Sequence, residues 1–231
     1  MKVIAFGSGK GGVGKSLVSA SVVVEMASRG LKVGLLDLDL HGPTQHLLFP
    51  TEGKFKADRS GIKPFTPISG VKVFSLGYLF KQEPLPIKGK EKYGMVLDFS
   101  WLIDWDDIDF LVVDLPPGTG DEHLAMLRAL KAPKIYLVSL PSEESISVVR
   151  RAYRLYEGEG FKPEGLVLNM CWLECNGSKV YPFGKDYRPS DMPVLVELPL
   201  EPNLSKKPLR KEENRYWEGI AKLVDRILSK S

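Results

Sequence analysis

The residues best suited to chemistry lie in a glycine-rich run near the N-terminus. Gly9-Lys10-Gly11-Gly12-Val13-Gly14-Lys15-Ser16 has the spacing G-x-x-x-x-G-K-[ST]. Glycines let backbone N–H groups approach phosphate oxygens without an intervening Cβ, and a helix N-terminus beyond them adds unpaired donors. We expect Lys15 to contact the β- and γ-phosphates of a nucleotide and the Ser16 hydroxyl to bind Mg²⁺. The residues predicted to bind the nucleotide here are Gly9, Lys10, Gly11, Gly12, Val13, Gly14, Lys15, Ser16 and Leu17.

Three aspartates follow apolar runs and can complete such a site. Asp114 ends the run 110–113, and we expect its carboxylate to hold Mg²⁺ through water. Asp37 and Asp39 end another run, and residues two apart on a strand share a face. Ligands bind at the carboxyl ends of strands in open α/β sheets, which favours a functional role over two solvated carboxylates. After Asp114 come two prolines and two glycines, and a γ-phosphate can draw the Gly118 N–H inward as in switch loops.

These residues need a sheet that brings strand ends together, and the remaining sequence predicts one. Strands that are apolar on both faces alternate with amphipathic helices, which predicts an α/β fold with a doubly wound, mostly parallel sheet of about seven or eight strands. The predicted strands are 3–6, 32–37, 71–76, 110–114, 135–139, 165–169 and 194–198, and the predicted helices are 15–28, 121–131, 142–157 and 213–229. Residues 49–70 and 174–193 are predicted as long loops within a single domain, 1–231. A strand before the glycine-rich run and a helix after it favour a nucleotide loop over an ordinary turn.

The composition argues against several other classes of protein. The 231 residues are 43% hydrophobic and 26% charged, which excludes a disordered or coiled-coil chain. No apolar run approaches the roughly 18 residues of a membrane span, and a net charge of +3 is too small to indicate nucleic-acid binding. Two cysteines and the lack of a signal-peptide pattern favour a reducing cytoplasm. His41, His46 and His123 lack metal-ligand spacing and are interpreted as surface or loop residues, and Asp104 as part of a solvated acidic face.

The run Lys10 to Ser16 resembles the deviant Walker A loop of the superfamily that contains MinD, ParA, the nitrogenase iron protein and the Mrp family. The resemblance implies an ATP-hydrolysing homodimer, in which Lys10 reaches the partner's nucleotide and acts like an arginine finger. It also implies that Asp37 belongs to the magnesium shell and that Asp39 positions the attacking water. The implied catalytic residues are Lys10, Lys15 and Asp39, and the implied Mg²⁺ ligands are Ser16, Asp37 and Asp114.

A second stretch narrows the resemblance to one branch. Asp-Leu-Pro-Pro-Gly-Thr-Gly-Asp, residues 114–121, resembles the hallmark of the Mrp (ApbC-like) branch, whose members carry iron–sulfur clusters. This implies a chain that carries or assembles clusters for apoproteins. Asn169 closes a predicted strand where the superfamily hydrogen-bonds adenine, although an Asn there also suits a turn. The segment Leu198-Pro199-Leu200-Glu201 resembles the second base-contacting segment, so the implied nucleotide-binding set extends to Gly118, Asn169, Pro199, Leu200 and Glu201.

The two cysteines depart from the pattern of this branch. Its carriers have Asn-Met-Ser and then a C-x-x-C pair, but here Cys171 replaces the serine, Cys175 stands at the first cysteine and Ser178 at the second. A two-fold dimer doubles two thiolates to four, the number that a [4Fe–4S] cluster takes, and four thiolates also suit zinc. The alternative is one buried thiol and one idle thiol.

Two other functions stay open on the sequence alone. A positioning ATPase of the ParA or MinD type would need a basic face for DNA or an amphipathic membrane helix, and neither stands out. A nucleotide-dependent adaptor that binds a partner and no metal is kept open by the altered cysteine pair.

Overall fold

The computed structural model describes residues 1–39, 42–52, 54–78, 102–130, 133–184, 187–205 and 209–230, so the interpretation of His41 lies outside the described residues. Within these ranges an eight-stranded sheet has the order β12-β9-β8-β1-β7-β2-β6-β5. Every neighbouring pair in it is parallel except β5 and β6, which confirms the predicted mostly parallel sheet. The strands are β1 (Lys2–Ser8), β2 (Val33–Asp37), β5 (Phe65–Ile68), β6 (Val71–Ser75), β7 (Phe110–Asp114), β8 (Lys134–Ser139), β9 (Pro163–Leu168) and β12 (Val194–Glu197).

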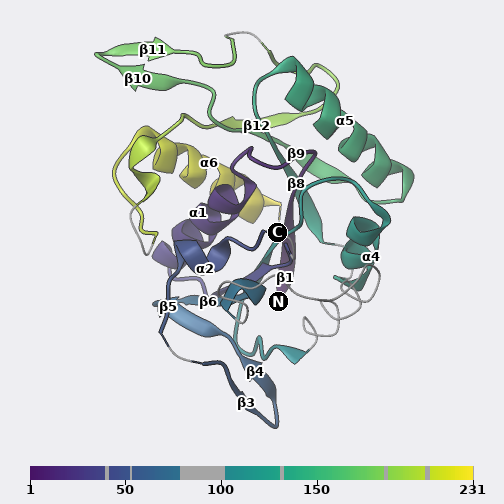
Figure 1. Cartoon of the computed structure of the whole chain (residues 1–231), viewed down its shortest axis with the longest axis vertical. Coiled ribbons are helices and arrows are strands. Elements are labelled where there is room, and N and C mark those ends of the chain that lie inside the picture. Colours follow the sequence, from purple (N-terminus) through teal and green to yellow (C-terminus); the bar gives the residue numbers. More distant parts are fainter. Residues whose placement is uncertain are drawn as a thin grey trace.

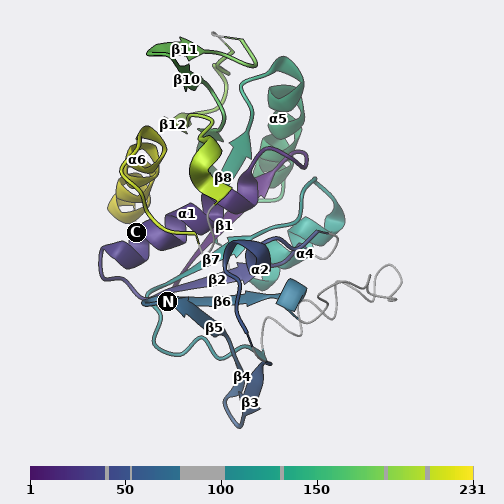
Figure 2. The same cartoon turned by 60° about the vertical axis from the view of Figure 1, so that its left-hand side comes forward.

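Helices cover both faces of this sheet, as a doubly wound fold requires (Figures 1 and 2). On one face lie α1 (Lys15–Ser28) and α6 (Arg215–Ser229), and on the other α4 (Asp121–Ala129) and α5 (Glu143–Gly158). Helix α1 packs between the sheet and α6, so its residues from Val18 to Met26 are all buried. It ends where Gly30 takes a φ of 84°, a left-handed conformation that glycine adopts without strain.

Strand alternation decides which face receives the strand-end carboxylates. On β2, Val33 and Leu35 belong to the core beneath α1, whereas Leu36 belongs to the core beneath α4 and α5. Asp37, two residues after Leu35, therefore faces α1. The same period on β7 puts Asp114 on the α1 face, and the parallel register makes Asp37 and Asp114 direct neighbours. The sheet thus brings two carboxylates to one edge, beneath the N-terminus of α1.

The two predicted loops contain short strands, so these two predictions were wrong in part. Residues 49–70 hold β5 and the hairpin of β3 (Lys56–Asp58) with β4 (Gly61–Lys63), and residues 174–193 include most of the hairpin of β10 (Leu173–Cys175) with β11 (Ser178–Val180). The second hairpin turns at Asn176 and Gly177, whose φ values are 50° and 75°. Asn-Gly suits a two-residue hairpin turn, but strands of three residues are too short to show an alternating pattern.

Two further observations concern charge and hydropathy. Asp104 is buried rather than part of a solvated acidic face, and it accepts hydrogen bonds from Ser60 and from the ammonium group of Lys63.

None of the helices in the described part of the chain is both long enough and apolar enough to span a bilayer.

Candidate nucleotide-binding site

The glycine-rich run connects β1 to α1 and forms one wall of a cleft of about 450 Å³. Gly14 precedes the helix with a φ of 83°, and Gly12 has a φ of 81°. No side chain caps the first turn of α1, which leaves its backbone N–H groups available to an anion. Gly9 lies against α5, where an added Cβ would come within 2.7 Å of the Val149 nitrogen. The cleft is lined by Ser8, Lys10, Gly11, Gly12, Val13, Gly14, Lys15, Ser16, Leu17, Asp39, Gly42, Thr44, Leu47, Leu48 and Pro117.

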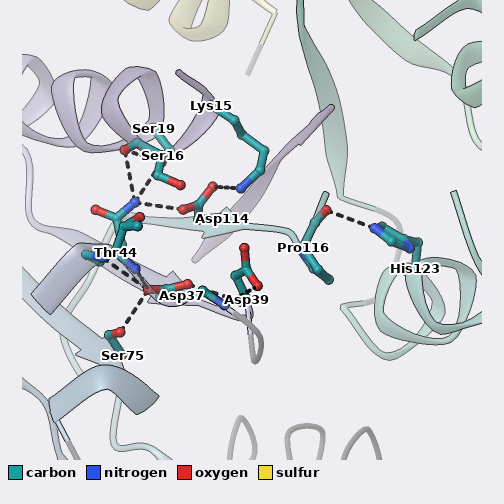
Figure 3. A network of polar contacts seen from close by, with 12 residues as sticks. Lys15, Ser16, Ser19, Asp37, Asp39, Thr44, Ser75, Asp114, Pro116 and His123 are labelled. Atoms are coloured by element: carbon teal, nitrogen blue, oxygen red, sulfur yellow. Dashed lines mark hydrogen bonds and ion pairs between the residues drawn. The ribbon is translucent and has the colours of Figure 1, made fainter. Parts of the chain in front are cut away.

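Lys15 lines the cleft, and its ammonium group forms an ion pair with Asp114 (Figure 3). Their side chains are 6% and 0% exposed, so both charges are buried. The other carboxylate oxygen of Asp114 accepts a hydrogen bond from Gln45 Nε2 at 2.8 Å. Gln45 belongs to the short helix α2 (Gln45–Leu48), and its Nε2 also donates to the Ser16 carbonyl and the Ser19 hydroxyl. The amide of Gln45 therefore ties the start of α1 to the strand-end carboxylate.

Asp37 is buried beside Asp114 and is held by backbone and side-chain donors. Its Oδ2 accepts hydrogen bonds from the N–H groups of Thr44 and Gln45, both at 3.1 Å, and from the Ser75 hydroxyl at 2.8 Å (Figure 3). Burial, with a smaller effect from the charge of Asp114, raises the pKa of Asp37 to about 7. A cation near both carboxylates would favour their charged forms.

The donors at this edge of the sheet fit a hard divalent cation. The predicted ligands Ser16, Asp37 and Asp114 offer only oxygen atoms, which Mg²⁺ prefers. Two further oxygens, Thr44 Oγ1 and Gln45 Oε1, are buried and make no hydrogen bond within the described residues. Unpaired buried oxygens are costly, so each of these two atoms calls for a hydrogen-bond donor beyond those that the described residues supply.

Asp39 lies beyond the end of β2, because that strand stops at Asp37 and the chain turns. Its N–H donates to Asp37 Oδ1 at 3.1 Å, and its own Oδ1 accepts from the Gly42 N–H at 3.0 Å. The expectation that Asp37 and Asp39 share one face of a strand is therefore wrong, although the Asp39 side chain still lines the cleft. Figure 3 shows Asp37, Asp39 and Asp114 grouped below the start of α1.

The Gly118 N–H, predicted to sense a γ-phosphate, donates to the carbonyl of Ser8 at 3.0 Å. Gly118 has a φ of 107°, a conformation that other residues rarely adopt. The neighbouring Pro117 lines the cleft, so the loop between β7 and α4 borders the space where a terminal phosphate would lie.

The two segments predicted to contact the base lie side by side. Asn169 follows β9, and Leu198 to Glu201 follow β12; the Cys171 N–H donates to the Leu198 carbonyl at 2.9 Å and the Leu200 N–H to the Trp172 carbonyl at 2.7 Å. The Asn169 amide is buried and donates to the Val13 carbonyl at 2.9 Å. Asn169 thus supports the glycine-rich loop in this structure, and its contact with adenine stays a prediction, as do those of Pro199, Leu200 and Glu201.

The two cysteines lie in different environments. Cys171 is buried, its thiol donates to the Leu168 carbonyl at 3.4 Å, and burial raises its pKa to about 12. Cys175 is exposed on the β10–β11 hairpin, directly across from Ser178. Within the described residues no three His, Cys, Asp or Glu side chains form a group that could hold a metal. One protomer in this conformation therefore offers a single accessible thiol.

Sequence reasoning missed two residues of the site. Gln45 gave no signal, because it lies in a four-residue helix outside every predicted element. The interpretation of His123 as a surface or loop residue is wrong, because it lies in α4, is 3% exposed and hydrogen-bonds the loop that contains Gly118. His46 is half-buried and packs edge-on against Tyr78.

A strand, a glycine-rich loop and a helix whose lysine and serine face two strand-end aspartates define the class of P-loop NTPases. The family model of ParA, described as the NUBPL iron-transfer P-loop NTPases, matches residues 1–224, and the chain belongs to this family.

Proteins and structures similar to the chain agree with this assignment. An iron-sulfur cluster carrier protein of Saccharolobus solfataricus is 33% identical over 209 residues, which cover 86% of this chain and 71% of the relative. A second one, from Aquifex aeolicus, is 32% identical, and the match spans 89% of this chain but only 59% of that protein. The nucleotide-binding protein of Archaeoglobus fulgidus, solved in complex with ADP, is 34% identical with a TM-score of 0.79, covering 94% of this chain and 90% of that one. MinD of Pyrococcus horikoshii, complexed with Mg-ADP, shares the fold at 19% identity with a TM-score of 0.71, covering 98% and 95%.

Proposed function

We propose that this chain hydrolyses ATP to ADP and phosphate and uses the cycle to carry iron–sulfur clusters to apoproteins. The proposal of ATP hydrolysis depends on one observation: Lys15, Ser16, Asp37 and Asp114 lie together at one edge of the sheet, beside the cleft. The proposal of cluster carriage is supported by membership of the iron-transfer family and by relatives named as cluster carriers.

Binding of ATP requires that Lys15 exchange one anionic partner for another. In the nucleotide-free state its ammonium neutralises Asp114, and in the bound state it contacts the β- and γ-phosphates. Mg²⁺, held by Ser16, Asp37 and Asp114, would offset the negative charge that Lys15 leaves behind and the charge of the phosphates. The buried pair thus holds the Asp114 carboxylate in place beside Asp37 before the nucleotide binds.

Hydrolysis then needs a positioned water and a stabilised leaving group. Asp39 lines the cleft and accepts a hydrogen bond from the water that attacks the γ-phosphorus. As the new P–O bond forms, the bond to the β–γ bridging oxygen breaks and ADP leaves, a proton of the attacking water passes to the released phosphate, and Lys15 stabilises the developing charge. Lys10 also lines the cleft, and we propose that it reaches the nucleotide of a second protomer in a homodimer.

The cluster is cargo rather than a resident group, and the exposed hairpin is the place proposed for it. Cys175 is exposed there, so a two-fold dimer presents two accessible thiols. Four thiolates require that Cys171 leave its buried position. The Drosophila relatives are named cytosolic assembly factors, which supports the cytoplasm as the compartment.

The burial of Cys171 favours a second candidate, a nucleotide-dependent adaptor that carries no metal. One experiment separates the two. The protein is purified without oxygen, supplied with iron and sulfide, and examined for a visible absorbance band and for transfer to the apo form of an iron–sulfur protein. We expect a band in the wild type that Cys175→Ser abolishes. A wild type without a band would leave the adaptor, and a band that survives in Cys175→Ser would place the cargo elsewhere.

A further inference from the structure

The middle of the loop that links β7 to α4 lies at the edge of the cleft. Residues nearer the two ends of this loop are hydrogen-bonded to a single side chain of α4. Its middle residue, Gly118, donates its N–H to the Ser8 carbonyl at the end of β1. Its neighbour Pro117 lines the cleft, and Ser8 leads directly into the glycine-rich loop. If the Gly118 N–H exchanged the Ser8 carbonyl for a phosphate oxygen, the conformation of this loop would depend on whether a terminal phosphate is bound.

His123 holds both ends of this loop from the first turn of α4. Its Nδ1 accepts a hydrogen bond from the Gly120 N–H at 3.2 Å. Its Nε2 lies 2.8 Å from the Pro116 carbonyl oxygen, a contact that Figure 3 shows. A backbone N–H can only donate and a carbonyl can only accept, so Nδ1 is unprotonated and Nε2 carries the proton. The ring is 3% exposed, and its two hydrogen bonds fit the Nε2–H tautomer.

The imidazole ring also lies close to Gly118, the residue midway between its two hydrogen-bonding partners. A Cβ added to Gly118 would be 3.8 Å from His123 Cε1, which places the imidazole against the middle of the loop. Pro116 and Pro117 restrict the chain before Gly118, because each proline has a fixed φ. With Pro116 and Gly120 held, the Gly118 peptide is the part of the loop that can rotate at low cost, since glycine accepts many backbone conformations.

We infer that His123 is a positioning residue, which fixes the two ends of the loop so that the Gly118 N–H can exchange the Ser8 carbonyl for the terminal phosphate of ATP. This inference rests on the proposed ATPase function. Helix capping alone would explain the bond to Gly120, because a side chain at the third helical position often reaches back to the residue before the helix. Capping does not require the second bond, from Nε2 to the Pro116 carbonyl, which crosses the loop.

Two variants separate positioning from capping. His123→Phe keeps a ring of similar size and removes both hydrogen bonds. His123→Gln restores an amide that can bond Gly120 and Pro116. For each protein we would measure the Kd of ADP, the Kd of a non-hydrolysable ATP analogue, and the kcat and KM of ATP hydrolysis. In the wild type, ¹⁵N NMR of the imidazole and of the Gly118 amide would be recorded with ADP and with the analogue.

For His123→Phe we expect the Kd of ADP to change less than about twofold and kcat to fall about 10- to 100-fold, because misplacing a group by about 1 Å can cost about 100-fold. We expect the wild type to bind the analogue more tightly than ADP, because the analogue offers a terminal phosphate to the Gly118 N–H. In His123→Phe this difference should disappear and KM should rise by the same factor, and His123→Gln should recover most of kcat. In the wild type the ring should stay in the Nε2–H form in both states while the Gly118 amide signal shifts.

Three results would overturn the inference. One is an unchanged kcat in a folded His123→Phe protein, and another is a ring protonated at Nδ1. The third, which applies even if His123→Phe does not fold, is a Gly118 amide signal in the wild type that is the same with ADP and with the analogue. A wild type that binds no nucleotide or hydrolyses no ATP contradicts the proposed function itself, and that result is visible before any variant is compared.

Discussion

Replacing Lys15 with methionine should destabilise the nucleotide-free protein, because the change leaves a charged Asp114 with no cation. Asp114 is fully buried, and Asp37 is its direct neighbour in the sheet. Removing one partner of a buried ion pair costs about 3–5 kcal/mol. The remaining hydrogen bond from Gln45 reduces this cost, so we expect a value near the lower end, about 3 kcal/mol.

The expected cost corresponds to a measurable change in melting temperature. An unfolding entropy of about 2.1 cal/mol/K per residue gives about 0.5 kcal/mol/K for this chain, so 3 kcal/mol lowers Tm by about 6 °C. Tm would be measured by calorimetry without nucleotide or Mg²⁺. The matched control is Lys10→Met, which removes a lysine that also lines the cleft but whose charge acts on Glu144 and not on Asp114.

A double-mutant cycle isolates the pair from other effects of the substitutions. In Lys15→Met combined with Asp114→Asn, the uncompensated charge is gone, so the double variant should be more stable than Lys15→Met alone. A Tm for Lys15→Met within about 1 °C of the wild type would refute the reasoning, since it would mean that the ion pair is not formed without nucleotide.

The remaining predictions concern hydrolysis, thiol reactivity and pH. Lys10→Ala should bind ATP as the wild type does but hydrolyse it more slowly in a turnover assay; normal turnover would exclude a role across the dimer. An aromatic disulfide reagent should modify Cys175 quickly and Cys171 only on unfolding, because burial raises the pKa of Cys171 to about 12; two fast equivalents per chain would contradict this. The Lys63 ammonium holds the pKa of Asp104 well below its ordinary value of 3.8, so this pair stabilises the fold above about pH 4 and is lost below it. Asp104→Asn should therefore flatten the acid side of the stability profile in urea titrations, and an unchanged acid side would count against the pair.

The main parts of the site could be predicted because local spacing and strand ends define them. The run from Gly9 to Ser16 is a contiguous motif, and Asp37 and Asp114 end apolar strands whose order in an α/β sheet brings them together. No such rule finds Gln45, since its position depends on the chain returning to Asp37 after the strand has ended. The function of His123 depends on a contact back to Pro116, which a search for metal-ligand spacing does not detect.

The hairpins found within the two predicted loops were also missed because they depend on contacts that the local sequence does not show. Strands of three residues in the two hairpins depend on pairing with each other rather than on a hydrophobic pattern of their own. The Asn176-Gly177 turn was readable, but the prolines and glycines that follow it favoured a loop. The burial of Cys171 likewise follows from its bond to Leu198, a residue 27 positions away, which no local spacing encodes.

Isothermal titration calorimetry with ATP and Mg²⁺ tests the central claim most directly, namely that the loop between β1 and α1 binds the phosphates of a nucleotide. We predict saturable heat with one nucleotide per chain in the wild type and in Lys10→Met, and none in Lys15→Met at a temperature where that variant is folded. A wild type that releases or absorbs no heat of binding with either ATP or ADP would contradict the account.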